Sequence, residues 1–354
     1  MGKDSIRRTL DEGVFNEALV ELNNDFLNDL PDKPENLFKY TSRRVEPEIS
    51  NNISYDLGRK MLDYRLSDKE YFITFLKIVR YVFNGKKPSK TPESNILLSQ
   101  TGAGKSNLRE LILRQNPNSV IIDSDKFKRF RSDADDIFEK DAPHFGALTG
   151  IDSYDHANNI NRYAMEKGYN ILVECAPSLS QGMIGVDIEL MEKHSYNINY
   201  HALAVGNLIS SFSIHKRYEK DIRDEKMKGE AKLTDLGRHD DSYNAMTNVI
   251  KNINTNKLFI YRRGTENENY VPVLIDATDK ITKFEELQHV SNMSYAKEQN
   301  KLNMPDYNEL KKQMKERQAV STQLEQLEKI RDNFLLFCLK AKIKTQVFDD
   351  LLEI

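Results

Sequence analysis

The sequence predicts an α/β fold in which a parallel sheet is flanked by helices, with helical extensions at the N- and C-terminal ends. From Asn95 onward, short apolar runs alternate with longer amphipathic stretches, which is the pattern of strands and helices in turn. The apolar runs are continuous rather than alternating, as expected of strands that are covered on both faces. Regions with helical periodicity lie before and after this part of the chain.

Residues 1–90 have the apolar periodicity of helices. One predicted helical face lies within 14–26 and a second within 71–79, and the proline-containing stretch 31–47 between them is predicted to be a loop. A second breaker at 85–92 contains a glycine and two prolines. We therefore predict a helical N-terminal region over 1–90 and a domain boundary at its end.

The central region, 91–290, carries the predicted sheet. Its strands are expected at 96–98, 120–122, 171–173, 199–205, 257–261 and 270–275. Its helices are expected at 106–114, from Asp125, and at 151–166, 207–224 and 243–253.

The C-terminal extension, 291–354, is predicted to be helical. After Asp306 the sequence predicts one long polar helix with an apolar stripe, comprising Leu310, Met314, Leu324, Leu327 and Phe334. Such a stripe either packs on the protein's own core or binds a partner protein. We expect packing on the core.

Composition and charge exclude several classes of protein. The 354 residues include 52 Lys and Arg against 55 Asp and Glu, so the net charge of -3 gives no general attraction for nucleic acid. No apolar run approaches the ~20 residues of a membrane span. Residues 1–10 lack the apolar block of a secretory signal, so we expect a cytoplasmic protein without a membrane partner. Two cysteines, Cys175 and Cys338, cannot form a disulfide framework.

The most informative segment follows the first strand of the central region. It fits the phosphate-loop pattern G-x-x-x-x-G-K-[ST], except that Ser99 stands at the first glycine position. An apolar run precedes it and an amphipathic run follows it, which is the context that this motif requires. We predict an ATP or GTP site formed by Gln100, Thr101, Gly102, Ala103, Gly104, Lys105, Ser106 and Asn107.

Each part of this loop has a chemical reason. Gly102 and Gly104 allow successive backbone N–H groups to turn toward phosphate oxygens. The helix that begins near Lys105 adds the positive end of its dipole. The Lys105 ammonium would reach the β- and γ-phosphates, and the Ser106 hydroxyl would complete the coordination of Mg²⁺.

Carboxylates follow two of the predicted strands. We expect Asp125 to act as the general base that takes the proton of a substrate hydroxyl, and Asp123 to be structural. The alternative is a helix N-cap, and one of the two aspartates can cap while the other is the base. Glu174 ends the run Ile171-Leu-Val and would bind Mg²⁺ with Ser106, or else form a structural ion pair.

Basic residues follow the next strand. Arg217 lies on a predicted helix, and Lys232 and Arg238 lie in a polar stretch that contains glycine. Cations stabilise the charge of a phosphoryl group in transfer, so we interpret the three as a phosphate-binding lid. A solvated helix face is the alternative for each residue taken singly.

These segments, in this order, resemble the zeta toxin family over about 95–276. The resemblance rests on the phosphate loop, on Ile121-Ile-Asp-Ser-Asp125-Lys-Phe, on Gly168-Tyr-Asn-Ile-Leu-Val-Glu174 and on Arg217-Tyr-Glu219. It implies a P-loop kinase fold and ATP- and Mg²⁺-dependent phosphorylation of the sugar 3′-hydroxyl of UDP-N-acetylglucosamine. It also implies toxicity that an antitoxin suppresses by covering the ATP site.

The resemblance assigns roles to single residues. Lys105 and Ser106 match the family's phosphate and Mg²⁺ positions, Asp125 its base and Arg217 its phosphate clamp. Lys232 stands near the family's second arginine, and lysine keeps the charge but loses the planar, two-pronged donor.

The acceptor half departs from the family. Cys175-Ala176-Pro177-Ser178 replaces the family's Gly-Thr-Gly-Arg, and Asn158 or Asn159 stands where the family has an acidic contact. We therefore expect retained phosphoryl transfer with an acceptor that can differ from UDP-N-acetylglucosamine. The alternatives are a kinase of nucleotides, nucleic-acid ends or proteins, and a nucleotide-binding protein without catalysis.

Overall fold

The computed structural model describes residues 6–45, 54–141, 144–183, 185–224, 233–301 and 303–343. The chain divides into two compact units, each formed by interleaved segments. The first unit comprises Met1–Asn95, Gln115–Glu174 and Gly185–Ile198, and the second comprises Ile96–Arg114, Cys175–Ile184 and Asn199–Ile354. The division into 1–90, 91–290 and 291–354 that the sequence suggests stays a prediction.

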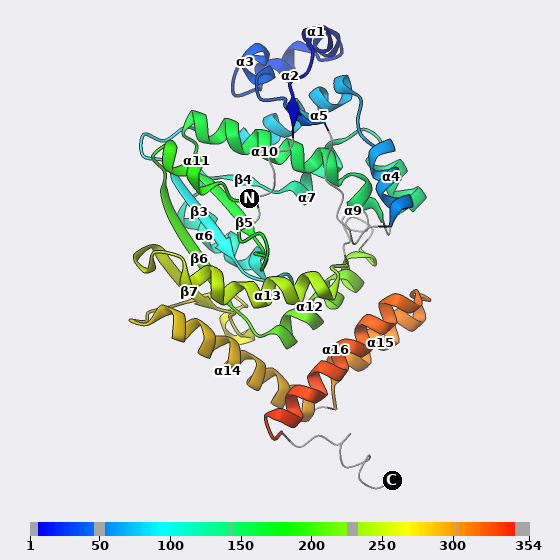
Figure 1. The fold of residues 1–354 in the computed structure, drawn as a ribbon, viewed down its shortest axis with the longest axis vertical. Coiled ribbons are helices and arrows are strands. Elements are labelled where there is room, and N and C mark those ends of the chain that lie inside the picture. The colour runs from blue at the N-terminus through cyan, green and yellow to red at the C-terminus, as the bar shows by residue number, and fades with distance from the viewer. Residues whose placement is uncertain are drawn as a thin grey trace. The chain divides into compact units, whose positions relative to one another are not determined.

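The predicted fold class is confirmed: a mostly parallel central sheet is flanked by helices (Figure 1). In the first unit, β4 (Val120–Ile122) pairs in parallel with β5 (Ile171–Cys175). In the second unit, the strand order is β3-β6-β7-β8, with β6 and β7 parallel and β7 and β8 antiparallel. These strands are β3 (Glu93–Leu98), β6 (Asn197–Ala204), β7 (Leu258–Arg262) and β8 (Val273–Ile275).

The first unit is mainly helical outside its strands. A short antiparallel pair, β1 (Arg7–Arg8) and β2 (Arg43–Arg44), adds to it. Its helices are α1 (Glu12–Val20), α2 (Asn24–Asn28), α3 (Pro34–Phe38), α4 (Tyr55–Asp63), α5 (Asp68–Phe83), α7 (Ser124–Phe127), the 3₁₀ helix η1 (Lys128–Phe130), α8 (Ala134–Asp141), α9 (Phe145–Leu148), α10 (Gly150–Lys167) and α11 (Ile188–Lys193).

Helix α5 shows how the sequence determines an element of this unit. Ser67 and Glu70 form a reciprocal capping box at its start, which satisfies backbone N–H groups that the first turn leaves without partners. The apolar face predicted within 71–79 is buried along the helix. The predicted loop over 31–47 is wrong in part, because Pro34 begins the short helix α3 and Arg43 begins β2.

Buried charges join the strand pair β1–β2 to α10. Arg43 is buried and pairs with Asp152 at 2.8 Å and with Asp68 at 2.7 Å. Asp155 is fully buried and pairs with Arg44 at 2.8 Å. Because both aspartates point from α10 into the N-terminal segment, this segment forms part of the unit's interior.

The second unit holds the phosphate loop and the C-terminal helices. Its helices are α6 (Lys105–Gln115), α12 (Asn207–Asp221), α13 (Leu236–Lys251), the 3₁₀ helices η4 (Thr255–Lys257) and η5 (Glu266–Glu268), α14 (Lys280–Lys301), α15 (Pro305–Glu316) and α16 (Ser321–Lys340). The last three pack against α12 through a common core that contains Leu208, Phe212, Met314 and Phe334. The expected packing of the C-terminal stripe on the protein's own core is therefore observed.

Two expectations for this unit were wrong. The sequence predicted one long helix after Asp306, but the chain forms α15 and α16, which lie side by side (Figure 1). Gln318 adopts φ 57°, and Ala319 N–H donates to the carbonyl of Met314, which ends α15. The helix expected from Tyr243 begins earlier, at Leu236, because the Asp235 side chain caps it.

None of the helices in the described ranges is long and apolar enough to cross a membrane.

Candidate functional site

The phosphate loop connects β3 to α6 with the backbone that its glycines were predicted to allow. Gly102 has φ 80° and Gly104 has φ 97°, a region that residues with a Cβ atom rarely adopt. Ser99 does not have a positive φ, so a serine at the first motif position requires no strained backbone. Its N–H donates to the carbonyl of Cys175 at 3.2 Å.

The Lys105 ammonium lies over its own loop. Its Nζ atom donates to the carbonyl of Ser99 at 2.9 Å and to that of Gln100 at 3.2 Å. Lys105 is also the first residue of α6, so the loop and the positive end of the helix dipole occupy the same place. This arrangement fits a nucleotide phosphate, because the flexible side chain can exchange carbonyl oxygens for phosphate oxygens.

Helix α12 packs directly on the loop. A Cβ atom at Gly102 would lie 2.1 Å from the carbonyl oxygen of Ser210 and 2.9 Å from Cγ1 of Ile214. Gly102 is therefore required for close approach as well as for its φ. No atom of the described residues lies within 4 Å of a Cβ atom placed at Gly104, so among them this glycine is required for its backbone conformation and not for close packing.

A buried hydrogen-bond network holds the loop to this helix. Gln100 Nε2 donates to the carbonyl of Val205 at 2.8 Å and to Ser210 Oγ at 3.1 Å. Ser210 Oγ in turn lies 2.8 Å from Nε2 of the buried His239, whose Nδ1 lies 2.8 Å from an Asp240 carboxylate oxygen. Ser210 and His239 belong to no sequence motif and meet the loop only through the fold, so the sequence alone does not reveal them.

The geometry of α12 places Arg217 on the side of the helix that faces the loop. Residues 210, 214 and 217 are spaced as i, i+4 and i+7, so they share one helical face. Ser210 and Ile214 contact Gly102, and Arg217 lies about one turn beyond Ile214. Arg217 is exposed, and no hydrogen bond or ion pair joins its guanidinium to the residues that the structure describes.

The opposite face of α12 is buried. It carries Leu208, Phe212, His215 and Glu219, each at most 2% exposed. Burial, with a smaller contribution from the nearby Arg317 cation, lowers the pKa of His215 to about 4, so its imidazole is neutral at pH 7.

The sequence places Arg238 in a polar stretch before the predicted helix. In the structure Arg238 lies in the first turn of α13. Its guanidinium donates to the carbonyls of Ala176 at 2.5 Å and Pro177 at 2.9 Å and lies 3.2 Å from Asp241. In this structure it supports the segment that follows β5. Lys232, the other predicted lid residue after α12, lies outside the described residues.

The segment after β5 forms a small hairpin. Ser178 and Gly182 exchange backbone hydrogen bonds of 2.8 and 2.9 Å, and Leu179 N–H donates to Asp241 at 3.1 Å. Arg238 and Asp241 of α13 therefore hold the segment in which the sequence departs from the family pattern. Asp241 was missed, although its position three residues after Arg238 places both on one helical face.

The predicted carboxylates belong to the first unit. Asp123 caps α7, where its side chain accepts from the N–H groups of Asp125 at 3.1 Å and Lys126 at 3.3 Å. Asp125 is half exposed and accepts from Lys128 Nζ at 2.6 Å, while the Lys128 side chain is buried. Asp125 and Lys128 thus form an ion pair at the start of this segment, and the role of Asp125 as the base stays a prediction.

The first unit also holds Glu174 and the two asparagines, Asn158 and Asn159, that stand where the family has an acidic contact. Glu174 is the fourth residue of β5 and partly buried. Asn159 is buried in α10, and its Nδ2 donates to the Ser42 carbonyl at 2.9 Å and to the Tyr71 hydroxyl at 3.0 Å. Asn159 therefore has a structural role here, whereas Asn158 is exposed.

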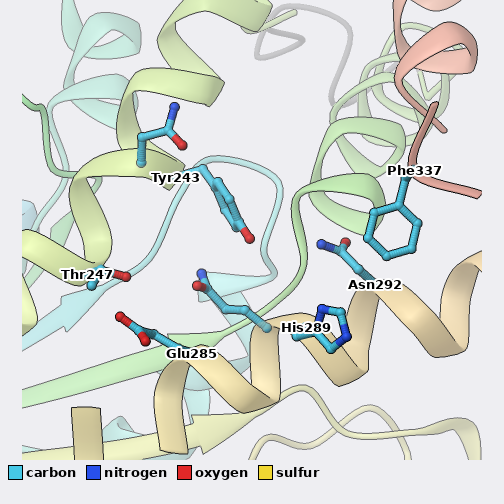
Figure 2. Close-up of a pocket in the computed structure, with 8 residues that line it drawn as sticks. Tyr243, Thr247, Glu285, His289, Asn292 and Phe337 are labelled. Atoms are coloured by element: carbon cyan, nitrogen blue, oxygen red, sulfur yellow. The ribbon is translucent and has the colours of Figure 1, made fainter. Parts of the chain in front are cut away.

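A polar pocket of about 390 Å³ lies in the second unit between α13, α14 and α16 (Figure 2). Tyr243 and Thr247 come from α13, Glu285 and His289 from α14, and Phe337 from α16. Burial raises the pKa of the Tyr243 hydroxyl, which keeps it a hydrogen-bond donor.

Comparison with known proteins shows the family. Residues 80–272 match the zeta toxin family over more than half of the chain.

The chain belongs to the zeta toxin family. It is 26% identical to Toxin zeta of Streptococcus pyogenes over 207 residues, which cover 56% of this chain and 66% of that protein. It is 28% identical to Toxin zeta of Enterococcus hirae over 189 residues, which cover 51% of this chain and 60% of that protein. The chain thus spans slightly less than two thirds of the length of these zeta toxins.

A solved structure has the same fold. A chain from the PezAT chromosomal toxin–antitoxin system of Streptococcus pneumoniae matches with a TM-score of 0.56 and 19% identity. The match covers 70% of this chain and 98% of that chain. The zeta toxin match ends at residue 272, so α14, α15 and α16 lie outside it.

Among the described residues, no group of three or more His, Cys, Asp and Glu side chains could hold a metal ion. The assignment of Ser106 and Glu174 as Mg²⁺ ligands stays a prediction.

Proposed function

We propose that this zeta toxin family member is an ATP- and Mg²⁺-dependent phosphotransferase that acts on a hydroxyl group of a small acceptor. The observation that carries the proposal is the phosphate loop. Two glycines at positive φ, a lysine over the loop carbonyls and a helix N-terminus occupy one place, supported by packing against α12. Few functions other than phosphate binding require these features together.

The proposed roles follow the chemistry of phosphoryl transfer. Lys105 and the loop N–H groups hold the β- and γ-phosphates, and Arg217 neutralises charge on the group in transfer. Bound Mg²⁺ would supply further neutralisation, held by Ser106 and Glu174 with water and phosphate oxygens. Asp125 accepts the proton of the attacking hydroxyl. ATP is proposed rather than GTP because the family resemblance points to it.

A nucleotide-sugar such as UDP-N-acetylglucosamine is the proposed acceptor class. The family supports this class, while the departure of Cys175-Ala-Pro-Ser178 from the family's Gly-Thr-Gly-Arg favours an acceptor pocket that differs from the family's. Because Arg238 and Asp241 hold the hairpin after β5, we propose that its sequence sets acceptor specificity. An antitoxin that covers the ATP site is the proposed protein partner, by analogy with the toxin–antitoxin system that contains the structural relative.

The test is a phosphoryl-transfer assay with the purified full chain. UDP-N-acetylglucosamine, other nucleotide-sugars, free nucleotides and nucleic-acid ends would each be incubated with radiolabelled ATP and Mg²⁺. We expect transfer to a nucleotide-sugar and a loss of at least about 100-fold in Lys105→Ala, because one charge-assisted phosphate contact in a transition state is worth several kcal/mol.

Matched variants separate the two aspartates. Asp125→Asn should lower turnover by about 100-fold or more with little change in ATP affinity, as removal of a general base does. Asp123→Asn keeps a capping side chain and should retain most of the activity. Equal losses from the two variants would contradict the assignment of the base. Full activity of Lys105→Ala would remove the phosphate loop from the mechanism.

A further inference from the structure

We propose that the C-terminal helices α14–α16 position the phosphate-binding face of α12, and that Arg317 is the residue through which they hold Arg217 in place. This inference rests on the proposed function, because it concerns how ATP phosphates are bound. The helices lie outside the part of the chain that matches the family, so the family match assigns them no role.

The beginning of α12 is held by α14. The N-cap residue Gly206 has no side chain that could cap the helix, and Asn292 of α14 supplies the cap. Asn292 Oδ1 accepts from Leu208 N–H at 3.1 Å, and Ser291 Oγ accepts from Gly206 N–H at 3.0 Å. A Cβ atom at Gly206 would lie 2.1 Å from Asn292 Oδ1, so the glycine makes room for this contact.

The end of α12 is held by Arg317, which follows α15. Its Nη2 atom lies 2.7 Å from Glu219 Oε1, and its Nε atom lies 3.0 Å from both carboxylate oxygens. The Glu219 side chain is 1% exposed, so the carboxylate end of this two-pronged contact is shielded from water. The guanidinium also lies 5.5 Å from the ring centre of Tyr218.

These contacts flank Arg217 in the sequence. Tyr218 and Glu219, the two residues that follow Arg217, both contact Arg317. Lys216, the residue before it, pairs with Asp306 of α15 at 2.5 Å. The residue before the predicted phosphate clamp and the two residues after it thus contact the C-terminal helices or Arg317, while Arg217 itself stays exposed.

The two faces of α12 explain how the contact between Arg317 and Glu219 affects the position of Arg217. Ser210 and Ile214 lie against Gly102 of the phosphate loop, whereas Leu208, Phe212 and Glu219 lie against the C-terminal helices. A rigid helix fixed on one side presents a defined surface on the other. Arg317 therefore sets the angle and the register of Arg217 relative to the loop without any contact with ATP.

The test is a double-mutant cycle on ATP affinity, measured by calorimetric titration of the full chain with ATP and Mg²⁺ and without an acceptor. We expect Arg217→Ala and Arg317→Ala each to weaken binding by about tenfold, the usual scale for one charge-assisted hydrogen bond. The double variant should bind no more weakly than Arg217→Ala alone, because Arg317 acts through Arg217.

Three variants make the result specific. Arg331→Ala removes an arginine from α16 that contacts only acids and Tyr307 of the extension among the described residues, and it should bind ATP like the parent protein. Arg317→Lys keeps the charge but loses the planar, two-pronged donor of the guanidinium. Its ATP affinity should therefore lie between that of the parent and that of the alanine variant. Glu219→Gln with Arg317→Met removes the pair without leaving a buried charge, and it replaces Arg317→Ala if that variant does not fold.

Two results would overturn the proposal and leave the proposed function intact. One is ATP binding by the Arg317 variants at the parent's affinity while Arg217→Ala loses affinity. The other is a double variant in which the two losses multiply. A parent protein that binds no ATP would instead contradict the proposed function, and with it the positioning role.

Discussion

At the scale of single residues, the phosphate loop shows which departures from a motif matter. Ser99 breaks the consensus, but its backbone does not need a positive φ, so a serine fits there. The critical position is Gly102, where both the backbone conformation and the approach of α12 exclude a side chain. The motif alone does not rank its glycines, because the ranking depends on a helix more than 100 residues further along the chain.

We predict different costs for alanine at the two loop glycines. Gly102→Ala should lower the free energy of unfolding by about 3 kcal/mol, since it adds a clash with Ser210 to the strain of a positive φ. Gly104→Ala should cost only about 1 kcal/mol, because the new methyl group would contact none of the described residues. Urea unfolding of both variants measures the difference. Equal costs would show that α12 does not pack on the loop as described.

At the scale of elements, buried ion pairs join parts of the chain that sequence periodicity treats as separate. The strands β1 and β2 are two residues long, and each contributes arginines that pair with acids of α5 and α10. Periodicity detects apolar faces, so it found α5 but not these short strands. Their position depends on charge partners that lie far away in the sequence, as Asp155 does from Arg7, and no local pattern reveals such partners.

Arg43→Ala tests the contribution of these pairs. We expect a loss of about 3 kcal/mol in the free energy of unfolding, because Asp152 would remain buried without its main partner. Arg8→Ala is the matched control from the same strand pair: its side chain is half exposed, so its pair with Asp68 should contribute less than about 1 kcal/mol. Chemical unfolding measures both values, and a small effect at Arg43 would contradict the description of this interior.

At the scale of the whole molecule, buried histidines link stability to pH. Burial lowers the pKa of His201 and His215 to about 4, and it lowers the pKa of His156 well below the ordinary value. The unfolded chain binds protons at these side chains below about pH 6.5, whereas the folded protein does not bind them at His201 and His215 until near pH 4. The contribution of these histidines to the free energy of unfolding is therefore fully present above pH 6.5. It decreases as the pH falls from 6.5 toward 4.

The expected slope is about 1.4 kcal/mol per pH unit for each such histidine. His215→Leu should reduce the slope between pH 5 and 6.5 by about that amount, because both ring nitrogens of His215 lack hydrogen-bond partners among the described residues. The measurement is the free energy of unfolding by urea across this pH range, for the parent and the variant. An unchanged slope would mean that His215 is protonated in the folded protein.

The fold class, most strands of the sheet and the family could be predicted from the sequence alone. These follow from local patterns, since apolar runs, caps and a phosphate loop are written in consecutive residues. Tertiary structure alone decided which side chains support the site. Ser210, His239 and Arg317 carry no motif, and they reach the loop or α12 because the chain folds back on itself.

The same reason explains contacts that the predicted roles did not include. Arg238 is predicted to be a lid cation from its charge, and that role stays a prediction; in the fold its guanidinium donates to the carbonyls of Ala176 and Pro177. Asn159 was a candidate acceptor contact until the fold buried it against Ser42 and Tyr71. A sequence records which chemical groups are available, and only packing decides which of them face water, a ligand or one another.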